Sequence, residues 1–210
     1  ATTEIYTLSL HDALPIYGYA EIVPEKEQEN INVNYIPHHG LYHPKKQKFR
    51  GVFNCASVYK NYSLNMNLLQ GPDLTNNLVG VLCRFRQEPV AFTCDIEGMF
   101  HQVRVNKEHR DLLRFLWWPA GDTSKKPQDY RMTVHLFGAT SSPGCANYAL
   151  KRTADDHESE FGSEAAQFVR QDFYVDDGLK SVATADEAVK LIKNVKQMCN
   201  SGGFNLHKFV

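Results

Sequence analysis

Residues 173–179 read FYVDDGL, so that two adjacent aspartates end an apolar run and a glycine follows directly. Asp-Gly is a common hairpin signal, and one interpretation is an ordinary turn between two strands, closed tightly by Gly178. The other is a metal site, because carboxylates crowded at the edge of a core repel one another unless a cation joins them. The pair alone favours the turn, so the decision depends on what else in the chain lies opposite it.

A third carboxylate ends another apolar strand. Residues 90–96 alternate, with apolar side chains on one face and Asp95 on the other. Because a strand end and a hairpin tip can lie side by side in an antiparallel sheet, we expect Asp95 to lie near Asp176 and Asp177. Mg²⁺ prefers one or two carboxylates together with substrate phosphates, and two such ions are the usual apparatus of nucleotidyl transfer. The three aspartates therefore predict a metal site that the hairpin helps to place.

The patterning along the chain predicts an α+β fold with a mostly antiparallel sheet and two helices on one face. The expected strands lie within residues 31–44, 45–56, 90–96, 112–119, 130–137, 167–175 and 204–209, and residues 167–182 form a hairpin. The expected helices are one opened by Gly71-Pro72-Asp73 and running to Phe85, one at 143–156 started by Ser142-Pro143, and one at 185–199 behind the capping box of Thr184 and Glu187.

Composition excludes little. The 210 residues are 42% apolar and 22% charged with a formal net charge of −1, which argues against coating nucleic acid by bulk charge but leaves room for a local basic groove. Five scattered cysteines favour a reduced, intracellular protein over a disulfide scaffold. The chain begins at Ala1 and reads as a fragment. Residues 1–16 show no clear period, and we expect an artefactual or disordered leader there.

Tyr174-Val175-Asp176-Asp177 is similar to the Tyr-x-Asp-Asp box of reverse transcriptases, and five further stretches follow the same family in matching order. They are KKQKFRGVFN (45–54), SLNMNLLQGPDL (63–74), FTCDIEGMFHQV (92–103), LFGATSSP (136–143) and GGFNLHKF (202–209). Each box alone is weak, but six in order are specific, and together they cover about residues 18–209. The strings YIPHHGLYHPKK, LLRFLWWP and HLFGATSSPGCANYAL most resemble the polymerase region of Pao/BEL-type retrotransposons with long terminal repeats.

The resemblance implies a right-hand polymerase palm, in which an antiparallel sheet carries two helices on one face in ferredoxin-like split βαβ order. It also implies fingers. We expect the fingers at about 17–89 with part of 101–130, and the palm at about 90–100 and 131–210. A thumb is not expected within the chain.

The resemblance also implies the metal ligands. Asp95 and Asp176 would hold two Mg²⁺ ions, or Mn²⁺ in their place, together with the backbone carbonyl of Ile96, while Asp177 would be more peripheral. One ion would lower the pKa of the primer 3′-OH, and the other would carry the nucleotide phosphates and the leaving pyrophosphate. Lys208 would donate a proton to the pyrophosphate, although an ordinary surface lysine is as good an interpretation.

Further roles follow from the same boxes. Arg50 and Lys46 would grip the triphosphate, for which the alternative is a solvated basic face. Phe100 would pack under the sugar and exclude a 2′-OH, or else simply belong to the core. Phe137 and Gly138 would contact the nucleotide. The expected template and primer contacts are Ser142, Pro143, Tyr174 and Val175.

Some features have a plainer interpretation. His38, His39 and His43 suggest zinc, but no further ligand stands at a suitable spacing, so structural or solvent-facing histidines are favoured. Trp117-Trp118 can stack on a base, but core packing is favoured. Asn54 and Met66 stand where related sequences often carry Asp, which hints at a decaying copy.

The sequence thus predicts an RNA-directed DNA polymerase that adds deoxynucleotides to a primer on an RNA or DNA template. The implied partners are the template-primer duplex, the dNTP, and the protease, RNase H and integrase parts of a retroelement polyprotein. The expected location is a cytoplasmic particle, with no membrane contact. Two alternatives stay open: a catalytically inactive remnant that at most binds nucleic acid, and a different nucleotidyl transferase on a similar palm.

Overall fold

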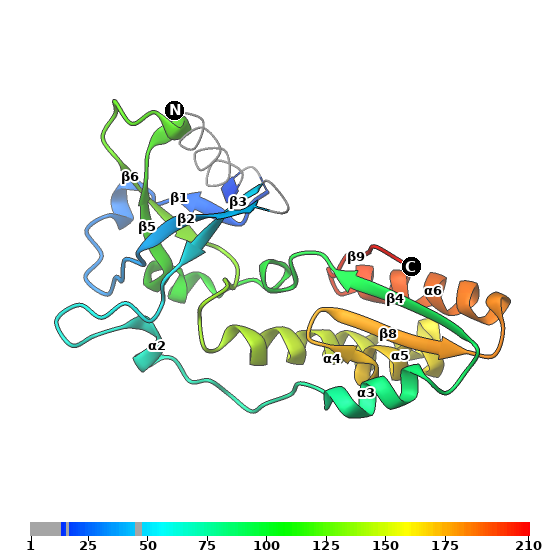
Figure 1. Cartoon of the computed structure of the whole chain (residues 1–210). Coiled ribbons are helices and arrows are strands. Elements are labelled where there is room, and N and C mark those ends of the chain that lie inside the picture. The colour runs from blue at the N-terminus through cyan, green and yellow to red at the C-terminus, as the bar shows by residue number, and fades with distance from the viewer. Residues whose placement is uncertain (1–13, 16, 45–47) are drawn as a thin grey trace. The chain divides into compact units, whose positions relative to one another are not determined.

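The computed structural model describes residues 14–15, 17–44 and 48–210, and they divide into two compact units (Figure 1). The first unit contains the chain up to Leu69 together with Arg104–Ser142, and the second contains Gln70–Val103 and Pro143–Val210. Within the described ranges no helix is long and apolar enough to cross a membrane. Most of the expected leader lies outside the described residues.

The first unit contains a three-stranded antiparallel sheet and a separate hairpin. The sheet has the order β1-β6-β5 and consists of β1 (Ala20–Ile22), β6 (Gln128–Met132) and β5 (Arg114–Trp117). The hairpin pairs β2 (His38–His43) with β3 (Lys48–Phe53). The Phe53 ring lies edge-on to Phe115 at 5.2 Å between centroids, so the hairpin shares the core of the sheet. The short helices are η1 (Glu25–Glu27), α2 (Leu64–Asn67), η4 (Lys107–Leu113) and η5 (Pro119–Gly121).

Buried arginines fasten the N-terminal segment to this sheet. Arg131 bonds Glu21 at 2.7 Å, Glu27 at 2.6 Å and Asp111 at 2.9 Å. The fully buried guanidinium of Arg114 donates to Asp111 and to the carbonyl oxygen of Glu27. Buried charges are tolerated when they are paired and hydrogen-bonded, which explains how these two arginines fit inside this unit.

The second unit is built on a four-stranded antiparallel sheet of order β7-β8-β4-β9. The strands are β4 (Val90–Ile96), β7 (Phe173–Tyr174), β8 (Asp177–Val182) and β9 (Leu206–His207). In β4 the apolar face is buried and Asp95 lies on the other face, as the alternation predicts. The short helix η3 (Met99–Gln102) follows β4.

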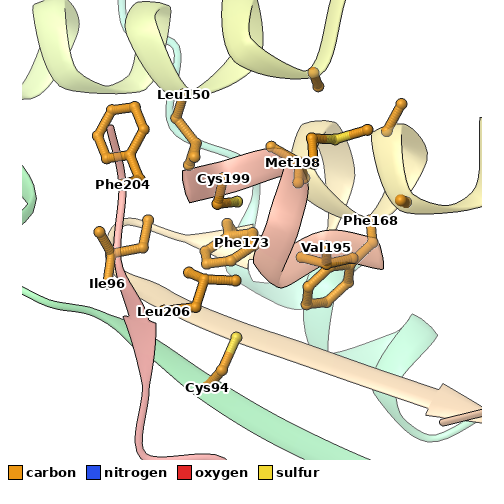
Figure 2. Packing of buried hydrophobic residues seen from close by; sticks show 14 of the residues in the cluster. Cys94, Ile96, Leu150, Phe168, Phe173, Val195, Met198, Cys199, Phe204 and Leu206 are labelled. Carbon is orange, nitrogen blue, oxygen red and sulfur yellow. The ribbon is translucent and has the colours of Figure 1, made fainter. Parts of the chain in front are cut away.

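Three helices cover the apolar face of this sheet (Figures 1 and 2). They are α4 (Ser142–Phe161), α5 (Ser163–Gln171) and α6 (Ala185–Ser201). Figure 2 shows Phe168 of α5 and Val195, Met198 and Cys199 of α6 over Cys94 of β4, with the Phe173 ring between them. A fourth helix, α3 (Leu78–Phe85), contacts β7 and β8.

The predicted fold class is confirmed, with two corrections to the elements. Residues 167–171, predicted to start a strand, belong to helix α5, so three helices and not two join the core. The helix expected from Asp73 begins only at Leu78, where the Asn77 side chain caps it by accepting from the Gly80 amide at 3.2 Å. The capping box at Thr184 is confirmed, since its hydroxyl accepts from the Glu187 amide.

Candidate active site

Strand register brings the three predicted aspartates together in the second unit. Asp95 on β4 is the cross-strand neighbour of Asp177 on β8 and of His207 on β9. The Ile96 amide donates to the carbonyl oxygen of Asp176 at 2.9 Å, which ties the tip of the hairpin to the end of β4. The sheet edge therefore presents carboxylates from two strands and the connecting turn.

The turn itself differs from the predicted one. Tyr174 pairs with Asp177, so the two-residue loop is Val175-Asp176, and Asp177 and Gly178 already belong to β8. Val175 has φ 57°, a conformation that β-branched residues rarely adopt. Strain of this kind persists where the surrounding structure enforces it and is frequent at functional sites.

Gly178 has a packing role instead of a turn role. A Cβ added there would lie 2.7 Å from Cys94 Sγ, 2.8 Å from Phe173 Cζ and 3.0 Å from Phe168 Cζ. These distances are well inside van der Waals contact, so only glycine lets the core close beneath the carboxylates. The prediction that Gly178 tightens the turn was wrong.

The charges at this edge are unevenly balanced. Burial and the neighbouring charges of Asp176 and Asp95 raise the pKa of Asp177, against a weaker opposing effect of Lys208. Burial also raises the pKa of Asp95, but hydrogen bonds from His207 and Lys208 outweigh it, so the pKa of Asp95 is lowered overall. Three carboxylates thus lie within electrostatic reach, and one of them, Asp95, is hydrogen-bonded by both His207 and Lys208.

The carboxylates at this edge are chemically suitable ligands for a divalent cation, but their side chains are not arranged as a coordination site. Mutual repulsion at Asp177 is what a cation would relieve, and carboxylate oxygens are the ligands that Mg²⁺ prefers. Across the part of the chain that the structure describes, no group of three or more His, Cys, Asp and Glu side chains is arranged as a ready metal site. The assignment of Asp95, Asp176, Asp177 and the Ile96 carbonyl as ligands stays a prediction.

The other predicted residues of the second unit have different surroundings. Phe100 is 9% exposed and belongs to the core cluster, which is the plainer of its two interpretations. Tyr174 and Val175 are half-buried in the hairpin, and Pro143 is exposed in the first turn of α4. Lys208 is 65% exposed and reaches Asp95 Oδ2 at 3.1 Å.

The first unit holds the predicted nucleotide loop. Gly138 has φ 102°, and a Cβ there would lie 2.7 Å from the Phe53 carbonyl oxygen, so glycine is required for the close approach. Asn65 donates to the Gly138 carbonyl at 2.9 Å and accepts from the Thr140 amide at 3.0 Å. Phe137, which precedes Gly138 in the chain, is 55% exposed.

Ser142 differs from its predicted surroundings. Its side chain is fully buried, and its hydroxyl donates a hydrogen bond to the Leu136 carbonyl at 2.8 Å. The hydroxyl is therefore not exposed for the predicted template or primer contact. Lys46 lies outside the described residues, and for Arg50 only the backbone is described, in β3 opposite Leu41. Their predicted phosphate contacts stay predictions.

The plainer interpretation holds for two aromatic features. Trp117 is buried, and the half-buried His38 ring lies 5.7 Å from it and 5.5 Å from Phe53. Burial lowers the pKa of His38. Both residues therefore serve the core of the first unit.

The sequence analysis missed two residues, His207 and Asn65. His207 Nε2 lies 2.6 Å from Asp95 Oδ1, and the only hint of it was its place in the box GGFNLHKF beside Lys208. Asn65 had a hint of the same kind, in the box SLNMNLLQGPDL. Neither contact follows from local patterning, because each joins residues far apart in the chain.

The structure is similar to solved structures of foamy virus protease-reverse transcriptases. One, a foamy viral protease-reverse transcriptase dRH in complex with double-stranded DNA, matches with a TM-score of 0.69 and 16% identity over 93% of this chain and 29% of that chain. The native prototype foamy virus protein matches with a TM-score of 0.67 and 18% identity over 97% of this chain and 23% of that chain. Its selenomethionine-labelled CSH mutant matches with a TM-score of 0.66 and 18% identity over 93% of this chain and 22% of that chain.

The chain thus spans less than a third of the length of the proteins it matches. No protein-family model matches the sequence. A comparison with curated proteins finds no match either. At this level of identity the likeness carries the architecture, and the chain has the mixed helical and antiparallel-sheet fold of a reverse transcriptase.

Proposed function

We propose that the chain is the fingers and palm part of an RNA-directed DNA polymerase from a Pao/BEL-type retrotransposon. The observation that carries the proposal is the convergence of Asp95, Asp176 and Asp177 at one edge of the palm sheet. The reverse-transcriptase fold supports the same reaction class. The palm corresponds mainly to the second unit and the fingers mainly to the first.

The chemistry proposed is transfer of a deoxynucleotide onto a primer 3′-OH. Two Mg²⁺ ions, or Mn²⁺, would supply activation of the hydroxyl and neutralisation of the phosphates when bound. The chain's own contribution is to fix the carboxylates: the hairpin turn places Asp176, cross-strand register places Asp177, and His207 and Lys208 orient Asp95. Lys208, whose ammonium group contacts Asp95, would give a proton to the leaving pyrophosphate.

A basic segment of the first unit supports contact with nucleic acid. From Asn30 to Leu69 the sequence contains no Asp or Glu, although the whole chain is slightly negative. The same segment carries Lys45, Lys46, Lys48, Arg50 and Lys60. Local positive charge of this kind neutralises phosphates and is the electrostatic signature of nucleic-acid binding.

The tip of this segment also offers aromatic surface. Tyr59 and Tyr62 close a two-residue turn through reciprocal backbone hydrogen bonds, and Tyr59 is 73% exposed. The Lys60 ammonium lies 5.3 Å from the centre of the Tyr59 ring. Exposed rings beside cations suit base stacking on an unpaired strand.

The finer assignments belong to the same proposal. The partners would be an RNA or DNA template-primer duplex and a dNTP, with Arg50 and Lys46 on the triphosphate and Phe100, Phe137 and Gly138 around the nucleotide. Protease, RNase H and integrase would be further parts of the polyprotein, and the location would be a cytoplasmic particle. The foamy viral relative was solved with double-stranded DNA, which supports duplex binding here.

Primer extension tests the proposal. The chain, alone and joined to a related thumb, is given an RNA template, a DNA primer, dNTPs and Mg²⁺, and wild type is compared with Asp95→Asn and Asp176→Asn. The exposed Asp156→Asn, which lies in α4 in a pair with Arg152, is the matched control. Incorporation that both site variants abolish and the control retains supports the enzyme. A folded protein that binds the duplex but incorporates nothing identifies the inactive remnant.

A further inference from the structure

A β-bulge aims Lys208 at Asp95. Asp95 pairs with His207, and two residues earlier on β4, Thr93 exchanges both backbone hydrogen bonds with Val210, at 3.0 and 3.2 Å. A regular antiparallel ladder would pair Thr93 with residue 209, so one extra residue is inserted opposite Cys94. Lys208 has φ 53°, the left-handed conformation that marks the first residue of one bulge type and is usually glycine there.

The bulge changes which side chains face the carboxylates. Leu206 is buried in the core and His207 lies on the opposite face, so an unbroken strand would turn Lys208 back toward the core. Instead Phe209 packs against the core cluster, and both His207 and Lys208 reach Asp95. The left-handed conformation is unfavourable for a lysine backbone. The contact between the Lys208 side chain and Asp95 gives a reason for a lysine at this position.

The two contacts on Asp95 are unequal. His207 Nε2 lies 2.6 Å from Oδ1, and its side chain is 31% exposed on a strand fixed by register. A carboxylate has no proton to give, so Nε2–H is the donor. Lys208 Nζ lies 3.1 Å from Oδ2, with 65% of its side chain exposed on a flexible stem.

We propose that His207 and Lys208 form a two-part clamp on Asp95, in which His207 is a positioning residue that keeps Oδ1 and Lys208 is a displaceable cation that holds Oδ2 for a divalent ion. Asp95 would then offer Oδ2 to a divalent ion while His207 keeps Oδ1. A bound ion would replace Lys208 at Oδ2 and so release its ammonium group. This inference rests on the proposed function, because it concerns the same metal site.

Mn²⁺ binding to the 210-residue chain tests the clamp without any turnover. We expect His207→Phe to weaken Mn²⁺ binding about 10- to 100-fold, the range seen when a hydrogen-bond partner of a metal ligand is lost, and His207→Gln to restore most of it. Lys208→Asn keeps a residue that tolerates the left-handed conformation, removes the competing cation, and should tighten binding about two- to fivefold. Lys208→Arg should bind no more tightly than wild type.

The chain offers matched controls. His157 is 30% exposed and lies 3.7 Å from Glu160, so His157→Phe repeats the His207 substitution at equal exposure. Lys125 is 60% exposed and pairs with Asp122, so Lys125→Asn repeats the Lys208 substitution. Both controls should bind Mn²⁺ as wild type does, and thermal unfolding verifies that each variant is folded.

A metal-free measurement completes the test. In ¹⁵N-histidine spectra without metal, the Nε2 resonance of His207 should shift in Asp95→Asn. The clamp is overturned if the Nε2 resonance does not shift or if the wild-type chain binds no Mn²⁺. It is also overturned if His207→Phe binds Mn²⁺ as tightly as wild type, or if Lys208→Asn leaves the affinity unchanged. The proposed function fails separately: if the Mn²⁺ and spectral results hold but no nucleotide is incorporated, the clamp stands and the polymerase does not.

Discussion

Asp95 and Asp177 are cross-strand neighbours whose ionisation acts on folding in opposite directions. The pKa of Asp177 is raised, so its ionised form destabilises the fold. That penalty is absent below the unfolded pKa of about 4 and complete above the raised folded pKa. The pKa of Asp95 is lowered, so its ionised form stabilises the fold. That contribution is present above about pH 4 and is lost as the pH falls through the lowered value.

In metal-free protein at pH 7 we therefore expect Asp177→Asn to raise the melting temperature slightly. Asp95→Asn should lower it by about 2 °C, since a partly exposed ion pair contributes roughly 1 kcal/mol or less. Both differences should vanish in strong acid, below the lowered pKa of Asp95, where the wild-type carboxyls are protonated. Thermal unfolding with a chelator from pH 2 to pH 8 measures this. Shifts of the same sign at pH 7 would contradict the electrostatic account.

Gly178 and Cys94 share one small space beneath these carboxylates. We expect Gly178→Ala to lower the free energy of unfolding by about 1–3 kcal/mol through overpacking, and Cys94→Ala in the same chain to restore part of it. Gly80→Ala, in helix α3 with only the Arg84 side-chain tip at 3.4 Å, is the control and should be neutral or stabilising. Denaturant unfolding measures all four proteins. A harmless Gly178→Ala would show that the glycine has no packing role.

At the scale of elements, a buried carboxylate joins α3, α5 and β8. The Asp172 side chain is 1% exposed and accepts from Arg84 at 2.5 Å and from Lys180 at 2.8 Å. Arg84 also donates to the Gln171 carbonyl. This cluster fixes the C-terminal end of α5 immediately before the β7-β8 hairpin.

Asp172→Asn should cost about 3 kcal/mol of unfolding free energy, because removing one member of a buried ion cluster leaves charge uncompensated. Asp156→Asn, which breaks the exposed pair with Arg152, should cost less than 1 kcal/mol. Chemical denaturation of the two variants gives the comparison. Equal costs would show that Asp172 is not important for the packing of α5.

The sequence predicted most of the elements, and the misses have physical causes. The β4 strand and the capped helix α6 were predicted because periodicity and local capping agree there. In α5 the apolar stripe begins with the small residues Ala165 and Ala166, and so short a helix owes its stability mainly to tertiary packing.

The start of α3 and part of the site could not be predicted from the sequence, because they too depend on tertiary contacts. Leu74 continues the helical stripe in sequence, but residues 70–77 form neither helix nor strand. Lys151 donates to the Leu74 carbonyl and Asn76 donates to the Phe173 carbonyl, and these long-range bonds hold the segment. The aspartates were found from strand endings, whereas the His207 contact depends on β9 register, which no local pattern records.

For the whole molecule, a net charge of −1 conceals a strong asymmetry along the chain. If the acid-free segment binds phosphates, changing Lys45, Lys46 and Lys48 together to Gln should reduce the salt slope of duplex binding by about two to three, since each phosphate contact contributes about 0.9. The control changes three exposed lysines of α6 to Gln: Lys190, Lys193 and Lys196. Fluorescence anisotropy across a salt series reads both. An equal loss in the control would mean that the segment holds no special site.

We propose that the carboxylates of Asp95, Asp176 and Asp177 serve to copy a template into DNA. The most direct measurement is addition of one nucleotide to a primer, on four hybrids that differ only in the first templating base of the RNA, each offered all four dNTPs with Mg²⁺. We expect the added nucleotide to follow the template base, and Asp176→Asn to add none while Asp156→Asn matches wild type. Addition that ignores the template base, or activity that survives in Asp176→Asn, would contradict the account.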